Sequence, residues 1–89
     1  MKASAKMTKA ILKLVKPWTD NLEECDDRNL NGVAISIVYG EEEEALKEAP
    51  NGYWDYAEVT IQDVRWDGTR NRFERDVYYV SHKGKITKS

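Results

Sequence analysis

The 89-residue sequence predicts an α+β fold: a three- to four-stranded, mostly antiparallel sheet with an N-terminal amphipathic helix and a short second helix over residues 41–49. Three observations predict it. Apolar residues recur with a helical period before Pro17, they alternate with a period of two in later segments, and turn-forming glycines separate these segments. The length fits one domain, residues 1–89, in which residues 1–6 are a candidate disordered leader and residues 83–89 a basic tail.

The first segment has the pattern of an amphipathic helix. The lysines at positions 2, 6, 9, 13 and 16 fall on one side of a helical wheel. Five apolar residues fall on the opposite side: Met7, Ile11, Leu14, Val15 and Trp18. Because Pro17 disfavours helical geometry at the residue before it, we expect the helix to end near Lys16. A competing interpretation makes residues 10–15 a strand that begins just after Met7, taken as the natural start.

The middle of the chain predicts a loop, a strand and a second helix. Polar residues 20–31 form the loop, with room for one helical turn, and Asn31-Gly32 closes it. A strand follows whose alternating residues predict one buried face: Val33, Ile35, Ile37 and Tyr39. Residues 41–49 then predict a short helix, because four glutamates occupy the end where the helix dipole favours negative charge and Pro50 lies just beyond its last residue.

The last third predicts a hairpin and a final strand. Residues 56–66 alternate but change phase, so we expect a β-bulge near Gln62 and Asp63. Asp67-Gly68 supplies the turn, residues 73–81 return as a strand, and Ile86 adds a last pairing.

Core positions in this hairpin follow from the same pattern. On the returning strand we expect Val77 and Tyr79 to point inward. Three aromatic residues are assigned to the core: Trp66, Phe73 and Tyr79. Three others are expected to be exposed: Tyr53, Trp54 and Tyr78.

Charge is divided along the chain although the net charge is only −2. Residues 1–16 carry five lysines and no acid, residues 17–64 carry thirteen acids against two basic residues, and residues 65–89 carry seven basic residues against three acids. Cys25 is the only cysteine, which excludes an internal disulfide and favours the cytoplasm. No stretch is apolar over the length of a membrane span.

The residues that could carry catalysis are few. His82 is the only histidine, and the acids around Cys25 would raise the pKa of its thiol, so neither forms a recognisable catalytic set. One cysteine and one histidine cannot complete a zinc site, and no glycine-rich phosphate loop is present. The remaining enzyme option is a magnesium-dependent phosphodiesterase that uses four acids near the hairpin: Asp63, Asp67, Glu74 and Asp76. We therefore predict no catalytic residue, no metal site and no cofactor.

These observations favour a non-catalytic interaction protein, regulatory or inhibitory, that binds another protein through acidic and aromatic surface. The predicted contact residues are Asp26, Asp27, Glu41, Glu42, Glu43, Glu44, Tyr53 and Trp54.

Two other functions and a self-association remain open. A nucleic-acid-binding protein would use the basic helix and the arginine-rich hairpin: Lys6, Lys9, Lys13, Arg70, Arg72, Lys83 and Lys85. A DNA-mimicking inhibitor would use the acidic middle instead. A homodimer could form through the apolar face of the helix.

Overall fold

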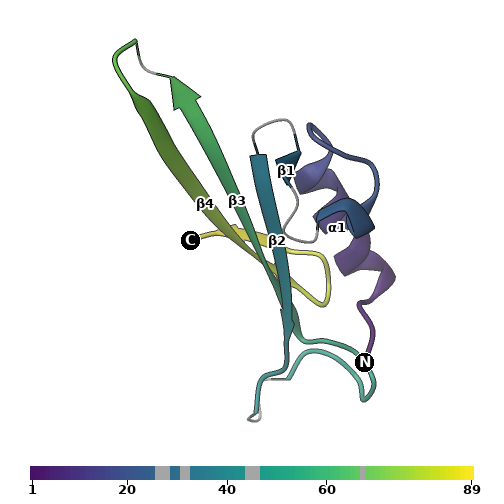
Figure 1. Cartoon of the computed structure of the whole chain (residues 1–89). Coiled ribbons are helices and arrows are strands. Elements are labelled where there is room, and N and C mark those ends of the chain that lie inside the picture. The colour runs from purple at the N-terminus through teal and green to yellow at the C-terminus, as the bar shows by residue number, and fades with distance from the viewer. Residues whose placement is uncertain (26–28, 31–32, 44–46, 67) are drawn as a thin grey trace.

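The computed structural model describes residues 1–25, 29–30, 33–43, 47–66 and 68–89. It contains one α-helix and one antiparallel sheet (Figure 1). The elements in chain order are α1 (Ala5–Val15), the 3-10 turn η1 (Leu22–Cys25), β1 (Asn29–Leu30), β2 (Val33–Gly40), β3 (Tyr56–Trp66), β4 (Asn71–Ser81) and β5 (Ile86–Lys88). The strands lie in the sheet in that same order, and β1 adds only two residues at its edge. The α+β prediction is confirmed.

Helix α1 covers one face of the sheet. The Ser4 hydroxyl caps it by accepting a hydrogen bond from the N–H of Met7 at 3.0 Å, and the helix ends at Val15, two residues before Pro17. Met7, Ile11 and Val15 are completely buried, so the apolar stripe faces the sheet and the alternative of a strand over residues 10–15 is wrong. Because this stripe forms the core, the homodimer through it is not supported. No helix in the described part of the chain is long and apolar enough to cross a membrane.

The core lies between α1 and the side chains of three neighbouring strands. Along β2 and as far as Ile61 on β3, alternate residues are buried or, like Ile37 and Tyr39, pack partly buried against the core, as the alternation predicts. The strand residues of this core are Val33, Ile35, Ala57, Val59, Ile61 and Val80. Cys25, at the end of η1, adds a small apolar side chain to the same cluster. One helix therefore covers only the central part of one sheet face.

The predicted helix over residues 41–49 is not confirmed. Glu41–Glu43 and residues 47–50 have irregular backbone, and residues 44–46 lie outside the described part. The carboxylate of Asp55 accepts hydrogen bonds from the N–H of Glu42 at 2.7 Å and of Ala49 at 3.2 Å. These two bonds satisfy the backbone N–H groups of Glu42 and Ala49 without a helix. A helix would instead bring together like-charged glutamates that are three or four residues apart, which destabilises it.

The predicted bulge in β3 is wrong. Cross-strand pairing runs without interruption from Tyr56↔Ser81 to Trp66↔Asn71, and β2 pairs with β3 in one register as far as Val33↔Asp63. The apolar pattern changes phase because β3 passes beyond β2 and the core at Asp63, so the alternation no longer has one buried side to follow.

The inward side of β4 is also opposite to the prediction. Val80 is completely buried and Tyr78 packs against the core, whereas Tyr79 is 42% exposed and Phe73 is 72% exposed. The register explains this, because Tyr78 lies opposite the buried Val59 and must share its face. The core assignment of Phe73 and Tyr79 is therefore wrong, as is the exposed assignment of Tyr78. The side chain of Trp66 lies outside the described residues.

Beyond the core, β3 and β4 continue as a two-stranded ribbon. The pairs from Val64↔Phe73 to Trp66↔Asn71 have no third strand beside them in the described structure, and the predicted turn joins them at Gly68, whose φ is +99°. Asp67 itself lies outside the described residues. The ribbon makes the molecule long, with principal extents of 49, 24 and 18 Å (Figure 1).

Candidate functional site

The sheet has one covered face and one open face. No described helix lies on the side opposite α1 (Figure 1). Alternation and register place the following residues on this open face: Ala34, Ser36, Val38, Tyr56, Glu58, Thr60, Gln62, Phe73, Arg75, Val77, Tyr79, Ser81 and Thr87. Val38, Phe73 and Tyr79 are the apolar or aromatic members with large exposed fractions, 58%, 72% and 42%. The open face thus presents apolar surface to solvent.

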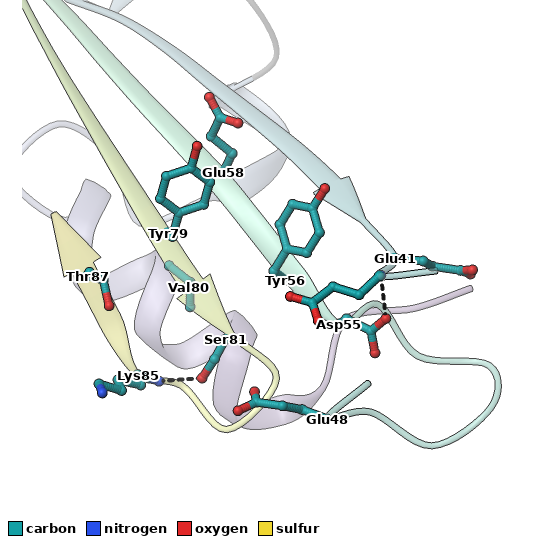
Figure 2. Close-up of a pocket in the computed structure, with 11 residues that line it drawn as sticks. Glu41, Glu48, Asp55, Tyr56, Glu58, Tyr79, Val80, Ser81, Lys85 and Thr87 are labelled. Carbon is teal, nitrogen blue, oxygen red and sulfur yellow. Dashed lines mark hydrogen bonds between the residues drawn. The ribbon is translucent and has the colours of Figure 1, made fainter. Parts of the chain in front are cut away.

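One end of the open face is hollowed into an acidic pocket (Figure 2). Its volume is about 650 Å³. It is lined by Glu41, Glu42, Glu48, Asp55, Tyr56, Glu58, Tyr79, Val80, Ser81, Lys85 and Thr87. Five carboxylates thus share this pocket with one ammonium group and two tyrosine rings, so its potential at neutral pH is negative. We call it the acidic hollow.

Asp55 positions the rim of the acidic hollow. Its side chain is 5% exposed, and besides the bonds to Glu42 and Ala49 its backbone joins two neighbouring segments. The N–H of Asp55 donates to the carbonyl of Gly40 at 3.0 Å, and the N–H of His82 donates to the carbonyl of Asp55 at 3.0 Å. The carboxylate of Asp55 is thus occupied by the protein itself, while Glu41, Glu42 and Glu48 remain exposed around it.

Tyr56 lies across the end of β2 beside the hollow. Its cross-strand partner is Gly40, and a Cβ at Gly40 would overlap the Tyr56 ring. The Tyr56 ring can therefore pack over this position only because Gly40 has no side chain. Figure 2 shows Tyr56, Glu58 and Tyr79 on the same side of β3 and β4, and Glu58 lies directly opposite Tyr79 in the register. The two rings and this carboxylate can contact one ligand together.

The predicted acidic contact residues are only partly brought together. Glu41 and Glu42 line the hollow, and Glu43 is exposed next to them without lining it. Asp26, Asp27 and Glu44 lie outside the described residues.

The predicted aromatic contact residues are partly buried and do not line the hollow. Trp54 stacks on Tyr39 with ring centroids 6.1 Å apart. Tyr53 meets the ring of His82 edge-on at 5.7 Å, and the Nζ of Lys2 lies 4.9 Å from the Tyr53 ring centre. Lys2 and Tyr53 also form a short parallel bridge that ties residues 1–4 to the body.

The candidate nucleic-acid contacts form two separate groups. Gly84, between Lys83 and Lys85, packs against the backbone of Lys6, and Lys9 and Lys13 are exposed further along α1. The second group, Arg70 and Arg72, lies at the end of the ribbon that is far from α1 (Figure 1). The structure does not join them into one basic surface.

Cys25, His82 and the hairpin acids, the candidate catalytic residues, lie in different parts of the described structure. Cys25 is 1% exposed, with its Sγ 3.9 Å from the carbonyl of Asn21, and the Nδ1 of His82 is buried without a hydrogen-bond partner in the described structure. Asp63 lies opposite Glu74 in the strand register, whereas Asp76 forms an ion pair with Lys88 at 3.3 Å. Among the described residues, no three acids, histidines or cysteines are grouped to hold a metal ion.

Sequence reasoning missed most residues of the hollow, among them Glu48, Tyr56, Glu58 and Tyr79. The sequence contained a usable signal for Tyr56 and Glu58, because the apolar Val59 and Ile61 share one side of the strand and residues of the other parity must face the opposite way. Tyr79 had none, since Val77 to Val80 are all apolar or aromatic.

Comparison with known proteins adds no assignment to this geometry. The chain matches no protein-family model, no curated protein and no solved structure. The function of the open face is therefore argued from its own residues.

Proposed function

We propose that this chain is a small non-catalytic interaction protein, regulatory or inhibitory, that binds another protein through the acidic hollow and the adjoining open face. The observation that carries the proposal is the hollow itself: solvent-exposed carboxylates surround two tyrosine rings on a sheet face that nothing in the described chain covers. Tyrosine is enriched in binding hot spots because it offers a large, rigid surface with a polar end.

The chemistry of the hollow favours a basic segment of the partner. Glu41, Glu42 and Glu58 can accept charge-assisted hydrogen bonds, and the faces of Tyr56 and Tyr79 attract a cation. An arginine satisfies both requirements, because its planar guanidinium binds a carboxylate with two hydrogen bonds and stacks on an aromatic ring. A cytoplasmic partner fits the single, buried Cys25.

The test is affinity capture from the native host with matched variants. The double variant Glu42→Gln/Glu58→Gln keeps side-chain size and removes two charges from the hollow, whereas Glu43→Gln removes an adjacent exposed charge outside it. We expect the double variant to lose a captured protein that the wild type and the control retain. Equal capture by all three would contradict the proposal.

Nucleic acid is a distinct outcome of the same experiment. Nuclease treatment of the lysate removes any capture that runs through DNA or RNA, and phosphate contacts would make that capture fall steeply as salt rises. If the retained protein binds DNA, competition between DNA and this chain tests the DNA-mimic alternative.

A further inference from the structure

The ribbon extends the open face beyond the body and leaves it uncovered. Phe73, on the ribbon, is the most exposed large apolar residue among those whose side chains the structure describes, and its cross-strand partner is Val64. A two-stranded hairpin is only marginally stable in water and gains stability when a further layer packs on it. The ribbon therefore has the geometry of an arm that packs on another surface.

The open face carries opposite charges at its two ends. The acidic hollow occupies one end, and Glu58 is its acidic residue on β3. Arg75 lies on the same face toward the ribbon, and Arg70 is exposed near the ribbon turn. The exposed Val38 and Tyr79 flank Glu58 on the two neighbouring strands at the same level. Such a face is complementary to a second copy of itself turned end to end.

We propose that a second copy of this chain covers the open face, related by a two-fold axis near the pair Thr60↔Val77. That pair lies midway between Glu58↔Tyr79 and Gln62↔Arg75 in the register. An axis that lies between the two sheets and crosses the strands obliquely at this pair reverses the levels, and it brings Glu58 of each copy opposite Arg75 of the other. It also places the level of Phe73 over the level of Tyr56, so that each ribbon covers the acidic hollow of the other copy.

Among the described residues, neither Glu58 nor Arg75 has a competing ion-pair partner. In the described structure Glu58 and Arg75 form no ion pair. The register separates them by four residues along the hairpin, because Arg75 lies opposite Gln62. Two sheets packed face to face lie about 10 Å apart, which is within reach of glutamate and arginine side chains that point toward each other. A dimer thus supplies the ion pairs that the monomer lacks, and it does so twice.

This inference rests on the proposed function, because it assigns an occupant to the same hollow. A different protein would bind only by displacing the second copy. Self-association would then regulate access to the hollow.

Sedimentation velocity of the pure protein over a concentration series tests the dimer. We expect the wild type to dimerise, and we expect Glu58→Arg and Arg75→Glu each to weaken the dimer by roughly tenfold or more. The double variant Glu58→Arg/Arg75→Glu restores both contacts with reversed sign and should dimerise again. Lys9→Glu, on the outer side of α1, should leave the dimer unchanged. Circular dichroism confirms that each variant is folded.

Three results would overturn the dimer: a wild type that is monomeric at every concentration, single variants that dimerise as the wild type does, or a folded double variant that remains monomeric. Failure of the dimer and failure of the proposed function are separable. A monomer that still captures a protein through Glu42 and Glu58 overturns only the dimer. A two-fold dimer whose hollow variants capture the same proteins as the wild type contradicts only the hetero-partner.

Discussion

The two faces of the sheet are built from the same strands but under different constraints. On the covered face Ile35, Val59 and Val80 are completely buried beneath α1. On the open face Val38, one residue from the covered face's Ile37 in the same strand β2, is 58% exposed. Packing therefore dictates the covered face, whereas nothing in the described part of the chain covers the exposed apolar and charged residues of the open face. The difference indicates that the open face is the one available for binding.

The largest expected contrast is between core and surface truncations in β2. Ile35→Ala should lower the free energy of unfolding by about 2–5 kcal/mol, because it leaves a cavity under α1. Val38→Ala should change it by less than about 1 kcal/mol. Urea denaturation of both variants measures the contrast, and equal losses would mean that the open face is packed in solution.

Two turn glycines, Gly84 in the body and Gly68 in the ribbon, have similar backbone conformations but different surroundings. Both have positive φ, +85° for Gly84 and +99° for Gly68, so alanine strains either backbone by about 1–3 kcal/mol. A Cβ at Gly84 would also lie 2.9 Å from the Lys6 carbonyl oxygen, whereas a Cβ at Gly68 meets nothing within 4 Å. Thermal unfolding should therefore show a larger loss for Gly84→Ala than for Gly68→Ala. The reverse order would contradict the packing of this turn on α1.

Asp55 joins the body to the rim of the acidic hollow. Asp55→Asn keeps one oxygen for the two N–H groups of Glu42 and Ala49 and should cost about 1–3 kcal/mol. The amides of Glu42 and Ala49 should exchange with deuterium faster, while the amides of β3 stay protected. Unchanged exchange at both amides would mean that the carboxylate does not hold the rim.

The smallest expected effect is a pH dependence on the covered face. Burial, followed by the charge of Cys25, raises the pKa of Tyr39 above its ordinary value. The unfolded chain then loses this proton first as pH rises above about 10, so the stability contributed by neutral Tyr39 is present below that pH and is lost above it. Tyr39→Phe should flatten this part of the stability curve. An unchanged slope in denaturation series from pH 9 to 11 would contradict the assignment to Tyr39.

Much of the fold could be predicted because single segments carry it. The stripe of Met7, Ile11 and Val15 and the alternation in β2 each define a buried side without reference to any other element. The phase of β4 could not be predicted, since Val77 to Val80 are apolar or aromatic on both sides and only pairing with β3 decides between them. The prediction of a second helix was not confirmed for a related reason. The carboxylate that accepts the N–H groups of Glu42 and Ala49 belongs to Asp55, which lies outside the segment.

The same limit applies to the candidate site. The sequence singled out Glu41 and Glu42 as contact residues, but it grouped them with Tyr53 and Trp54, which do not line the hollow. Their actual neighbours, Tyr56 and Tyr79, join the hollow through cross-strand register. Register depends on contacts between distant segments, so the sequence of either strand alone does not determine it.

The most direct test of the account compares capture by the two faces in one experiment. Glu42→Gln/Glu58→Gln removes two negative charges from the acidic hollow, and Lys9→Gln/Lys13→Gln removes two positive charges from the exposed side of α1. We expect nuclease-treated lysate to yield the same partner with the wild type and the lysine variant, and to lose it with the glutamate variant. Loss with the lysine variant alone would place binding on the helix side and contradict the account.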